Sequence, residues 1–305
     1  MDTPQHVPVL LEESLEFLAV HPGGVYTDAT LGLAGHSAEI ARRLGSEGKL
    51  IAFDRDPEAM SKAQARLTAL AEELGGESGP GMPTVEYVSR PFSEVAQVIA
   101  PGTLDGLLAD FGVSSLQFDE AHRGFSFRAD GPLDMRMDPR SELTAEQVVN
   151  QADEEELANL IYEFGEERRS RRIARAIVRA RPITTTADLA RVVSAVAPPI
   201  KSERGRSPIH PATRTFQALR IRVNDELQEI QSLLKSAGSL LKPGGRLVLI
   251  SFHSLEDRLV KDALRDGAKA GQYELLTKKP IVATEEESLR NPRSRSAKLR
   301  AAKKI

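Results

Sequence analysis

The sequence predicts an α/β fold in which a parallel β-sheet carries helices on both faces and is interrupted by an all-helical insert. Three observations support this prediction. Short apolar segments alternate with amphipathic ones through the first third of the chain. The alternation stops between about Phe118 and Pro211, where only helical patterning is found, and it resumes near the C-terminus. The 305 residues are enough to build such a core.

Four short apolar runs in the first third of the chain predict strands, at residues 25–30, 49–54, 85–88 and 104–109. An amphipathic segment, residues 10–18, precedes them. The turn TLGLAGHS follows the first expected strand and leads into a helix, and a second helix is expected to begin near Asp56, a residue type that caps helix N-termini. This order is typical of a doubly wound parallel sheet.

Helical spacing extends over residues 143–197, and an apolar stripe from Phe216 to Leu234 predicts one further helix. LKPGG should end that helix and lead to a strand over residues 246–252. We therefore expect a sheet domain made of residues 1–117 and 213–305, and an inserted helical domain made of residues 118–212.

The composition excludes several classes of protein. The chain has no cysteine, so disulfide scaffolds, cysteine zinc sites and thiolate nucleophiles are excluded. No metal-ligand spacing is visible, and no metal site is predicted. Neither a run of about 18 apolar residues nor a secretory signal pattern is present, which predicts a cytoplasmic protein without a membrane partner.

Positive charge is concentrated in two parts of a chain whose net charge is only −3. Fourteen arginines and lysines but only two acidic residues lie between Arg168 and Arg222. Seven more basic residues and no acid lie between Ser288 and Ile305. Such asymmetry indicates either a nucleic-acid surface or a set of solvated helix faces, and charge counts alone do not separate the two.

Ligands of open parallel sheets bind beyond the carboxyl ends of the strands, so the residues after each expected strand are candidate ligand contacts. Gly32 and Gly35 follow the first strand and permit a close backbone approach. Asp54 ends the second, where a carboxylate can accept hydrogen bonds from a ribose. Phe92 follows the third and could pack on an adenine, and Asp110 follows the fourth. Together, in this order, they favour a nucleoside site.

The kind of nucleoside is indicated by what surrounds these positions. The GxGxxG pattern typical of nicotinamide enzymes is absent, whereas LKPGG before a late strand is typical of S-adenosylmethionine-dependent methyltransferases. Proline and glycine would also end a helix in any protein. The lack of a thiol independently favours transfer to nitrogen or oxygen over transfer to cytosine C5.

Long motifs along nearly the whole chain resemble the bacterial small-subunit ribosomal RNA cytosine-N4 methyltransferase family, also called MraW or RsmH. They are HVPVL from His6, TLGLAGHS from Thr30, DFGVSSLQ from Asp110, RGFSFRADGPLDMRMD from Arg123, GEERRSRRIARAIV from Gly165, HPATRTFQALRIRVN from His210, LKPGGRLVLISFHSLEDR from Leu241 and NPRSRSAKLR from Asn291.

The resemblance implies a Rossmann-like class I methyltransferase that transfers a methyl group from S-adenosylmethionine to the exocyclic N4 of a cytidine near the ribosomal decoding site. The implied cofactor contacts are Ala34, Gly35, His36, Asp54, Phe92, Asp110 and Gln117. One departure is visible, because the family has two glycines before the histidine and this chain has Ala34 and Gly35. Either Ala34 has a negative φ or the turn is strained.

Several roles stay open at this level. Asp110 is the candidate group that orients the reacting amine. Ser114 either assists it or, with Ser115, caps the next helix. His253 either accepts a proton or only makes structural hydrogen bonds.

The expected RNA contacts, in the insert and just after it, are Arg123, Arg128, Arg136, His210 and Arg214, together with the arginines between Arg168 and Arg179 and the basic C-terminal tail. The DMRMD segment around Arg136 could equally be an internal ion-pair network. Partners would be small-subunit ribosomal RNA, free or in the assembled subunit, and dimerisation is left open. Two rival functions are a non-catalytic ribosome-assembly factor and a methyltransferase acting on DNA or a small molecule.

Overall fold

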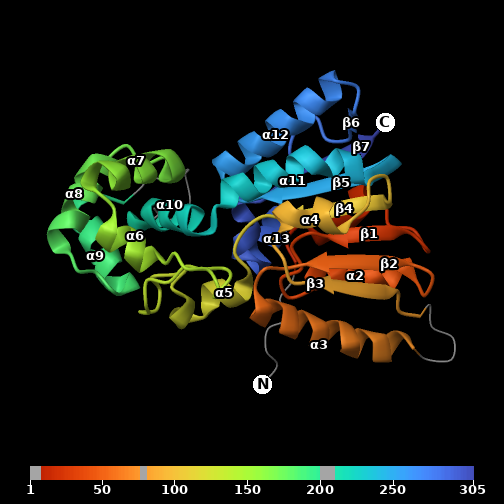
Figure 1. The fold of residues 1–305 in the computed structure, drawn as a ribbon, viewed down its shortest axis with the longest axis horizontal. Coiled ribbons are helices and arrows are strands. Elements are labelled where there is room, and N and C mark those ends of the chain that lie inside the picture. Colours follow the sequence, from red (N-terminus) through yellow and green to blue (C-terminus); the bar gives the residue numbers. More distant parts are fainter. Residues whose placement is uncertain (1–7, 76–80, 200–209) are drawn as a thin grey trace. The chain divides into compact units, whose positions relative to one another are not determined.

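A computed structural model describes residues 8–75, 81–199 and 210–305 (Figure 1). The chain divides into two compact units. The first unit combines Met1–Ser114 with Leu227–Ile305, and the second is Ser115–Glu226. Each unit is described by itself below.

The first unit is built on a mixed sheet, which has seven strands among the described residues. The strands are β1 (Val25–Asp28), β2 (Lys49–Phe53), β3 (Thr84–Val88), β4 (Leu104–Asp110), β5 (Leu241–Ser251), β6 (Tyr273–Leu275) and β7 (Lys298–Lys304). Their order is β3-β2-β1-β4-β5-β7-β6. The first five in this order are parallel, and β7 is antiparallel to both of its neighbours. The predicted parallel sheet is therefore confirmed.

Helices cover both faces of this sheet (Figure 1). They are α1 (Leu11–Leu18), α2 (Gly35–Leu44), α3 (Pro57–Leu74), α4 (Val95–Val98), α11 (Glu226–Leu240), α12 (Ser254–Lys269) and α13 (Glu285–Arg290). Short 3₁₀ turns lie at Phe92–Glu94 and Pro292–Ser296. Asp56 caps α3 as expected, since its side chain accepts a hydrogen bond from the Glu58 N–H at 3.0 Å.

The central strands are apolar on both sides because successive side chains point to opposite faces. Leu107 and Leu249 pack in one core cluster with residues of α4, α11 and α12. Their chain neighbours Leu108 and Ile250 pack in a second cluster with residues of α1 and α2. Burial of each such side chain contributes about 1.5–3 kcal/mol, so the core on both faces fixes the register that brings the strand ends together.

The second unit is helical. Its helices are α5 (Ser115–Asp119), α6 (Ala145–Gln151), α7 (Glu154–Gly165), α8 (Ser170–Ala180), α9 (Thr186–Val196) and α10 (Ala212–Asn224), with a 3₁₀ turn at Ala121–Arg123. Among the described residues of this unit, the only β-type pairing is the isolated bridge between Pro132 and Thr185.

The unit boundary differs from the expected one at its C-terminal side. Residues 213–226 were expected in the sheet domain, but α10 packs on α7 in the helical unit. Gln217 Nε2 donates to the Phe164 carbonyl at 2.9 Å. A Cβ atom on Gly165 would lie only 2.6 Å from the Arg214 carbonyl oxygen, so glycine permits this close approach.

The expected single helix from Phe216 to Leu234 is wrong, because α10 and α11 are separate. Asp225 between them has a left-handed backbone, with φ 49°. Asn224 Oδ1 accepts from the Met137 N–H at 2.7 Å, and Asn224 Nδ2 donates to the Met135 carbonyl at 2.8 Å. These side-chain bonds anchor the end of α10.

LKPGG is also more than a turn. It forms the start of β5, where Leu241 pairs with Leu104 and a register shift then places Arg246 opposite Gly106. The glycines lie in this irregular stretch, where Gly244 has φ 86°.

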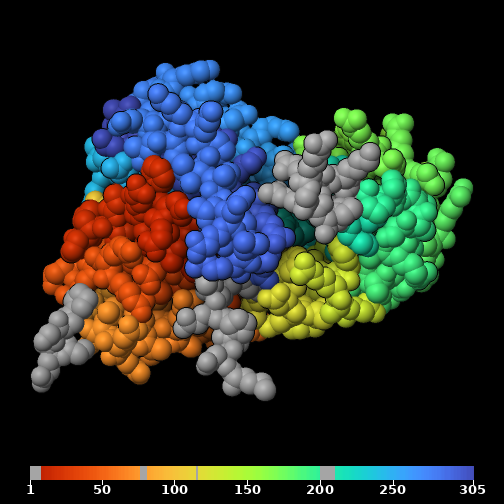
Figure 2. All heavy atoms as spheres, turned by 180° about the vertical axis from the view of Figure 1, so that it is seen from behind, coloured from red at the N-terminus to blue at the C-terminus, as the bar shows by residue number. Residues whose placement is uncertain are grey.

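The last part of the basic C-terminal tail, residues 298–304, is not a free basic surface, which corrects that part of the sequence interpretation, whereas Arg290 and Arg295 are exposed. Residues 298–304 form β7 inside the sheet, and Arg300 is only 8% exposed. Its Nε lies 2.7 Å from Asp257 Oδ1, and Lys298 Nζ lies 3.2 Å from Oδ2. Figure 2 shows blue C-terminal atoms beside red N-terminal ones. The Leu10 N–H donates to Glu287 Oε1 at 2.8 Å, which joins these two parts of the chain.

In the described parts of the chain, no helix has the length and apolar character needed to cross a membrane.

Candidate active site

Three carboxylates lie at or just after the carboxyl ends of adjacent parallel strands. Asp28 ends β1, Asp54 directly follows β2 and Asp110 ends β4. Figure 1 shows β2, β1 and β4 side by side. Because β1 pairs in parallel with both β2 and β4, the three residues lie at the same end of these strands. This is the end where open α/β sheets bind their ligands.

Asp54 is held by the backbone of two turns. Its Oδ2 accepts from the Gly32 N–H at 2.8 Å, and its Oδ1 accepts from the Asp56 N–H at 2.8 Å. Burial nevertheless raises the pKa of Asp54 to about 7, because removal from water disfavours the charged form. The carboxylate is thus held in one orientation by the backbone.

The turn after β1 contains backbone that favours glycine. Gly32 has φ 51°, and Ala34 has φ 58°, so of the two alternatives for Ala34 the strained one is found. The Ala34 N–H donates to the Leu31 carbonyl at 2.7 Å, and Ala34 directly precedes α2. Glycine at position 35 has a different cause, because a Cβ atom there would lie 2.4 Å from the Pro8 ring.

Asp110 has a carboxylate oxygen with no assigned function in the fold. Among the described residues, its buried Oδ1 has no hydrogen-bond partner. Burial raises the pKa of Asp110 well above its ordinary value, and the nearby charges of Asp28 and Glu256 raise it further. The Asp110 backbone N–H donates to Thr30 Oγ1 at 2.7 Å, which ties β4 to the turn after β1. An oriented acceptor without a donor is what a ligand amine or hydroxyl would satisfy.

His36 is a neutral neighbour of Asp110. Burial lowers the pKa of His36 to about 4, so its ring is uncharged near neutral pH. Its Nε2 lies 3.1 Å from the Val9 carbonyl oxygen and its Nδ1 lies 3.9 Å from Asp110 Oδ2. His36 therefore does not neutralise the Asp110 carboxylate.

Phe92 lies in the first unit beside Phe111, with ring centroids 5.5 Å apart. The Arg55 guanidinium lies 5.9 Å from the Phe92 ring centroid. Glu229 on α11 contacts both loops, since its Oε2 accepts from the Ser93 N–H at 3.3 Å and lies 3.7 Å from Arg55 Nη2. Sequence reasoning missed Arg55 and Glu229. Arg55 could have been suggested by its position directly after Asp54, whereas no feature of the sequence points to Glu229.

His253 and Ser114 also belong to the first unit. His253 is the N-cap residue of α12, directly after the tip of β5. Its Nε2 lies 3.0 Å from Glu256 Oε1, without the alignment of a hydrogen bond. Glu256 is fully buried, and its Oε2 accepts from the Phe252 N–H at 2.7 Å and the His253 N–H at 3.2 Å. Ser114 lies in the loop after β4, and Gln117 is buried on α5 of the second unit.

Two of the five expected RNA contacts have internal roles, which corrects those assignments. Arg123 is only 7% exposed and donates to the carbonyls of Arg136 and Met137 at 3.1 and 3.0 Å. Arg136 binds both oxygens of Asp134 at 2.8 Å and the carbonyls of Pro139 and Ser141. The alternative interpretation of DMRMD as an internal network is the one the structure supports.

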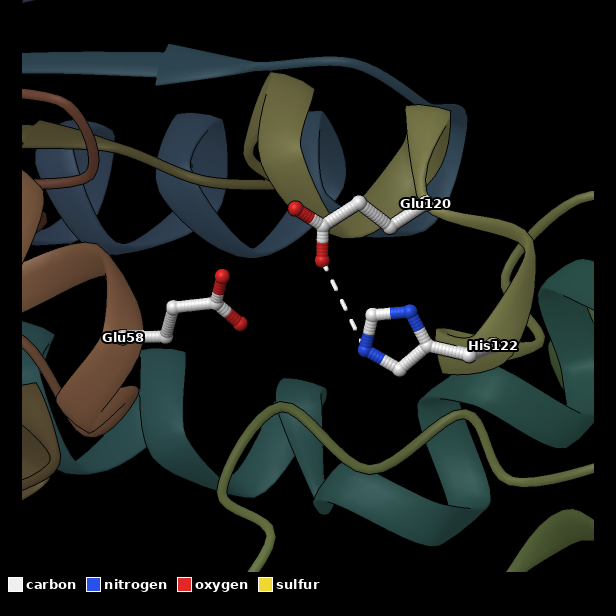
Figure 3. A group of neighbouring side chains, drawn as sticks. All are labelled: Glu58, Glu120 and His122. Carbon is white, nitrogen blue, oxygen red and sulfur yellow. Dashed lines mark ion pairs between the residues drawn. The ribbon is translucent and has the colours of Figure 1, made fainter.

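The other three expected RNA contacts are accessible. Arg128 and His210 are exposed, and Arg214 has a side chain that is 38% exposed. Further exposed arginines follow α7 and lie on α8: Arg168, Arg169, Arg171, Arg172, Arg175 and Arg179. Arg175 pairs with Glu154 at 3.2 Å. Glu120 and His122 of the same unit form the ion pair drawn in Figure 3, with Oε2 and Nε2 3.6 Å apart.

The strand order, the antiparallel last strands and the carboxylates at the strand ends define a methyltransferase of the Rossmann-like class. The chain belongs to the MraW methylase family, whose model matches residues 3–305. Its cofactor is S-adenosylmethionine.

Three relatives carry the name "Ribosomal RNA small subunit methyltransferase H". The protein from Acidobacterium capsulatum is 70% identical and aligns over 100% of both chains. Those from Koribacter versatilis and Solibacter usitatus are 62% and 50% identical, and the alignments cover 97% of this chain and 93% and 98% of theirs.

Proposed function

We propose that this chain methylates the exocyclic N4 of a cytidine in small-subunit ribosomal RNA near the decoding site, by direct in-line displacement. The names of its relatives support the RNA substrate, and the family supports the reaction class. The observation that carries the choice of an amine is the buried Oδ1 of Asp110 at the end of β4, which has no hydrogen-bond partner in the described part of the chain. It is suited to accept a hydrogen bond from an N–H group.

The residues at the strand ends fit S-adenosylmethionine. When bound, the cofactor supplies a methyl group activated by the sulfonium. Asp54 would accept hydrogen bonds from the ribose, and Phe92 would pack on the adenine. The turn containing Gly32, Ala34 and Gly35 would approach the cofactor through its backbone. His36 and Gln117 are further proposed contacts.

Glu229 is a proposed positioning residue for this site. It contacts Ser93, which follows Phe92, and Arg55, which follows Asp54. One side chain on α11 thus restrains both loops that would hold the adenosine. Fixing them in advance lowers the entropy that binding would otherwise cost.

Asp110 would orient the cytosine N4 amine. The nitrogen lone pair of this amine is delocalised into the ring, so alignment contributes much of the rate. A carboxylate that accepts one N–H bond favours a geometry in which the lone pair points at the methyl carbon. The amine nitrogen has to lose one proton when it is methylated, and Asp110 would accept this proton or pass it to water. Ser114 and His253 are the other candidate groups, and His253 is the second candidate proton acceptor.

The helical unit would bind the RNA. The exposed arginines of α8, with Arg128, His210 and Arg214, supply cations for phosphates. Because no thiol is present, the covalent route used for methylation at C5 is not available to this chain.

The test is methyl transfer with labelled S-adenosylmethionine to free ribosomal RNA and to assembled small subunits, followed by mass spectrometry of the digested nucleosides. We expect label in N4-methylcytidine, formed at least about a hundredfold more slowly by the Asp110→Asn variant. Label at C5 or on a ribose oxygen would contradict the proposal. RNA binding without any transfer would favour an assembly factor instead.

A further inference from the structure

A stack of three rings lies in the helical unit. Phe127 lies between His210 and Phe216, with ring centroids 4.5 Å from the first and 4.9 Å from the second. The His210 ring is tilted by 33° from that of Phe127, whereas Phe216 meets Phe127 edge-on at 72°. Phe216 is 5% exposed, Phe127 is partly buried and His210 is exposed. The stack therefore leads from the core of this unit to its surface.

The outer ring is fixed through its edges. His210 Nδ1 accepts from the Ala212 N–H at 3.2 Å, and Nε2 lies 3.4 Å from Ser194 Oγ. Holding an exposed side chain in one orientation costs rotamer entropy. A side chain that only keeps the surface soluble would not need to lose that entropy. With both nitrogens engaged and the Phe127 ring beside it, the exposed His210 ring is held in one orientation.

Two arginines lie close to these rings in the sequence. Arg128 follows Phe127 in the chain and is exposed, with its guanidinium 5.9 Å from the centroid of the Phe118 ring. Arg214 lies one helical turn beyond His210, and its Nη1 donates to the Glu166 carbonyl at 3.2 Å. Aromatic faces next to arginines are the combination by which proteins bind unpaired RNA, since the rings stack on bases and the cations neutralise phosphates.

We propose that the Phe127–His210 pair is a stacking platform for one unpaired base of the RNA substrate, with Arg128 and Arg214 near the adjoining phosphates. This inference rests on the proposed RNA substrate and adds a base-stacking subsite to it. It is independent of the methyl-transfer chemistry, because every residue in the subsite belongs to the helical unit.

The test uses a single-stranded oligoribonucleotide that contains 2-aminopurine, whose fluorescence is quenched when the base stacks. We expect quenching with the wild type. His210→Ala should abolish most of it and weaken binding roughly tenfold, given about 1–3 kcal/mol per stacked base. His210→Phe should retain both. Tyr162→Ala is the matched control, because Tyr162 is a 60% exposed aromatic residue of the same unit, and it should change neither.

Thermal unfolding of each variant verifies that it is folded. Absence of quenching with the wild type, or equal losses in His210→Ala and His210→Phe, would overturn the platform. If quenching follows these expectations but the protein methylates no cytidine N4, the platform stands and the proposed reaction fails. If methylation occurs and His210→Ala binds RNA like the wild type, only the platform fails.

Discussion

The backbone N–H of Gly32 donates to the carboxylate of Asp54 at 2.8 Å, which joins the turn after β1 to the tip of β2. The bond spans 22 residues of sequence. Asp54 is consequently held in one orientation, although its burial makes the charged form costly. A desolvated carboxyl group of this kind is more readily explained by ligand binding than by stability.

Asp54 should lower the stability of the protein as the pH rises. Its folded pKa of about 7 lies above its unfolded value, so the folded state binds a proton at Asp54 more tightly than the unfolded state does. This contribution to the free energy of unfolding is complete below about pH 4 and is lost as the pH rises to about 7. Asp54→Asn removes the titration. Relative to wild type, the variant should gain about 2 kcal/mol in unfolding free energy between pH 5 and pH 8, measured by urea unfolding. A difference that is constant with pH would contradict the buried, titrating carboxyl.

Ala34→Gly should be neutral or stabilising. Glycine relieves a left-handed backbone that costs alanine about 1–2 kcal/mol, while removal of the buried methyl group costs about 0.8 kcal/mol. Ala38→Gly in α2 is the control, because it loses a buried methyl group and helix propensity without relieving strain. It should destabilise by about 1–2 kcal/mol. Equal destabilisation of both variants in urea unfolding would show that Ala34 is not strained.

Asp110→Asn should lower the rate of methyl transfer at least about a hundredfold, the usual effect of removing one oriented polar group from an active site. The raised pKa also predicts that the wild-type rate falls as the pH is lowered, because a protonated carboxyl cannot take up the proton that the amine loses. The variant should unfold at a higher temperature than the wild type at pH 8, since a buried charge near Asp28 and Glu256 is removed. Unchanged turnover in a folded variant would rule out the role of Asp110.

RNA affinity should fall as the salt concentration rises. The exposed arginines of the helical unit should account for the slope of log K against log salt. Arg171→Ala combined with Arg172→Ala should reduce the slope of log K against log salt by about 1.5, or about 0.7–0.9 per phosphate contact. Arg136→Met is the control. Its guanidinium is engaged by Asp134, so this variant should lose stability and keep the slope. Equal slopes for all three proteins in filter binding would contradict a phosphate contact at α8.

The strands of the first third were predictable because each apolar run ends at a polar residue, as at Asp54 and Asp110. The break between α10 and α11 was not, since the end of α10 is anchored by bonds from Asn224 to Met135 and Met137, far away in sequence. In β7 the basic residues concealed the strand, because Arg300 becomes buried only by pairing with Asp257. Charge patterns alone do not identify such a partner.

The candidate site likewise contains some residues that could be predicted from the sequence and others that could not. Position after a strand was enough to select Asp54, Phe92 and Asp110. Glu229 could not be found in this way, because its contacts with Arg55 and Ser93 depend on how α11 packs on the sheet. Arg123 and Arg136 were expected to bind RNA because an arginine that holds carbonyl groups cannot be distinguished by sequence from one that faces solvent.

Glu229→Gln should weaken cofactor binding about five- to tenfold, because its contact with Arg55 would lose its charge and the loops carrying Asp54 and Phe92 would be less restrained. The KM for the cofactor should rise while kcat and the KM for RNA stay unchanged. Glu94→Gln, which removes an exposed carboxylate paired with Arg90, is the control and should have no effect. A fall in kcat with an unchanged KM would place Glu229 outside the cofactor site.

Titration calorimetry with S-adenosylhomocysteine, the product of the cofactor, tests most directly whether the strand ends hold the methyl donor. We predict one binding site per folded chain, with affinity reduced at least tenfold in Asp54→Ala and unchanged in Arg136→Met. Absence of binding by the folded wild type, or equal affinity in wild type and Asp54→Ala, would contradict the account.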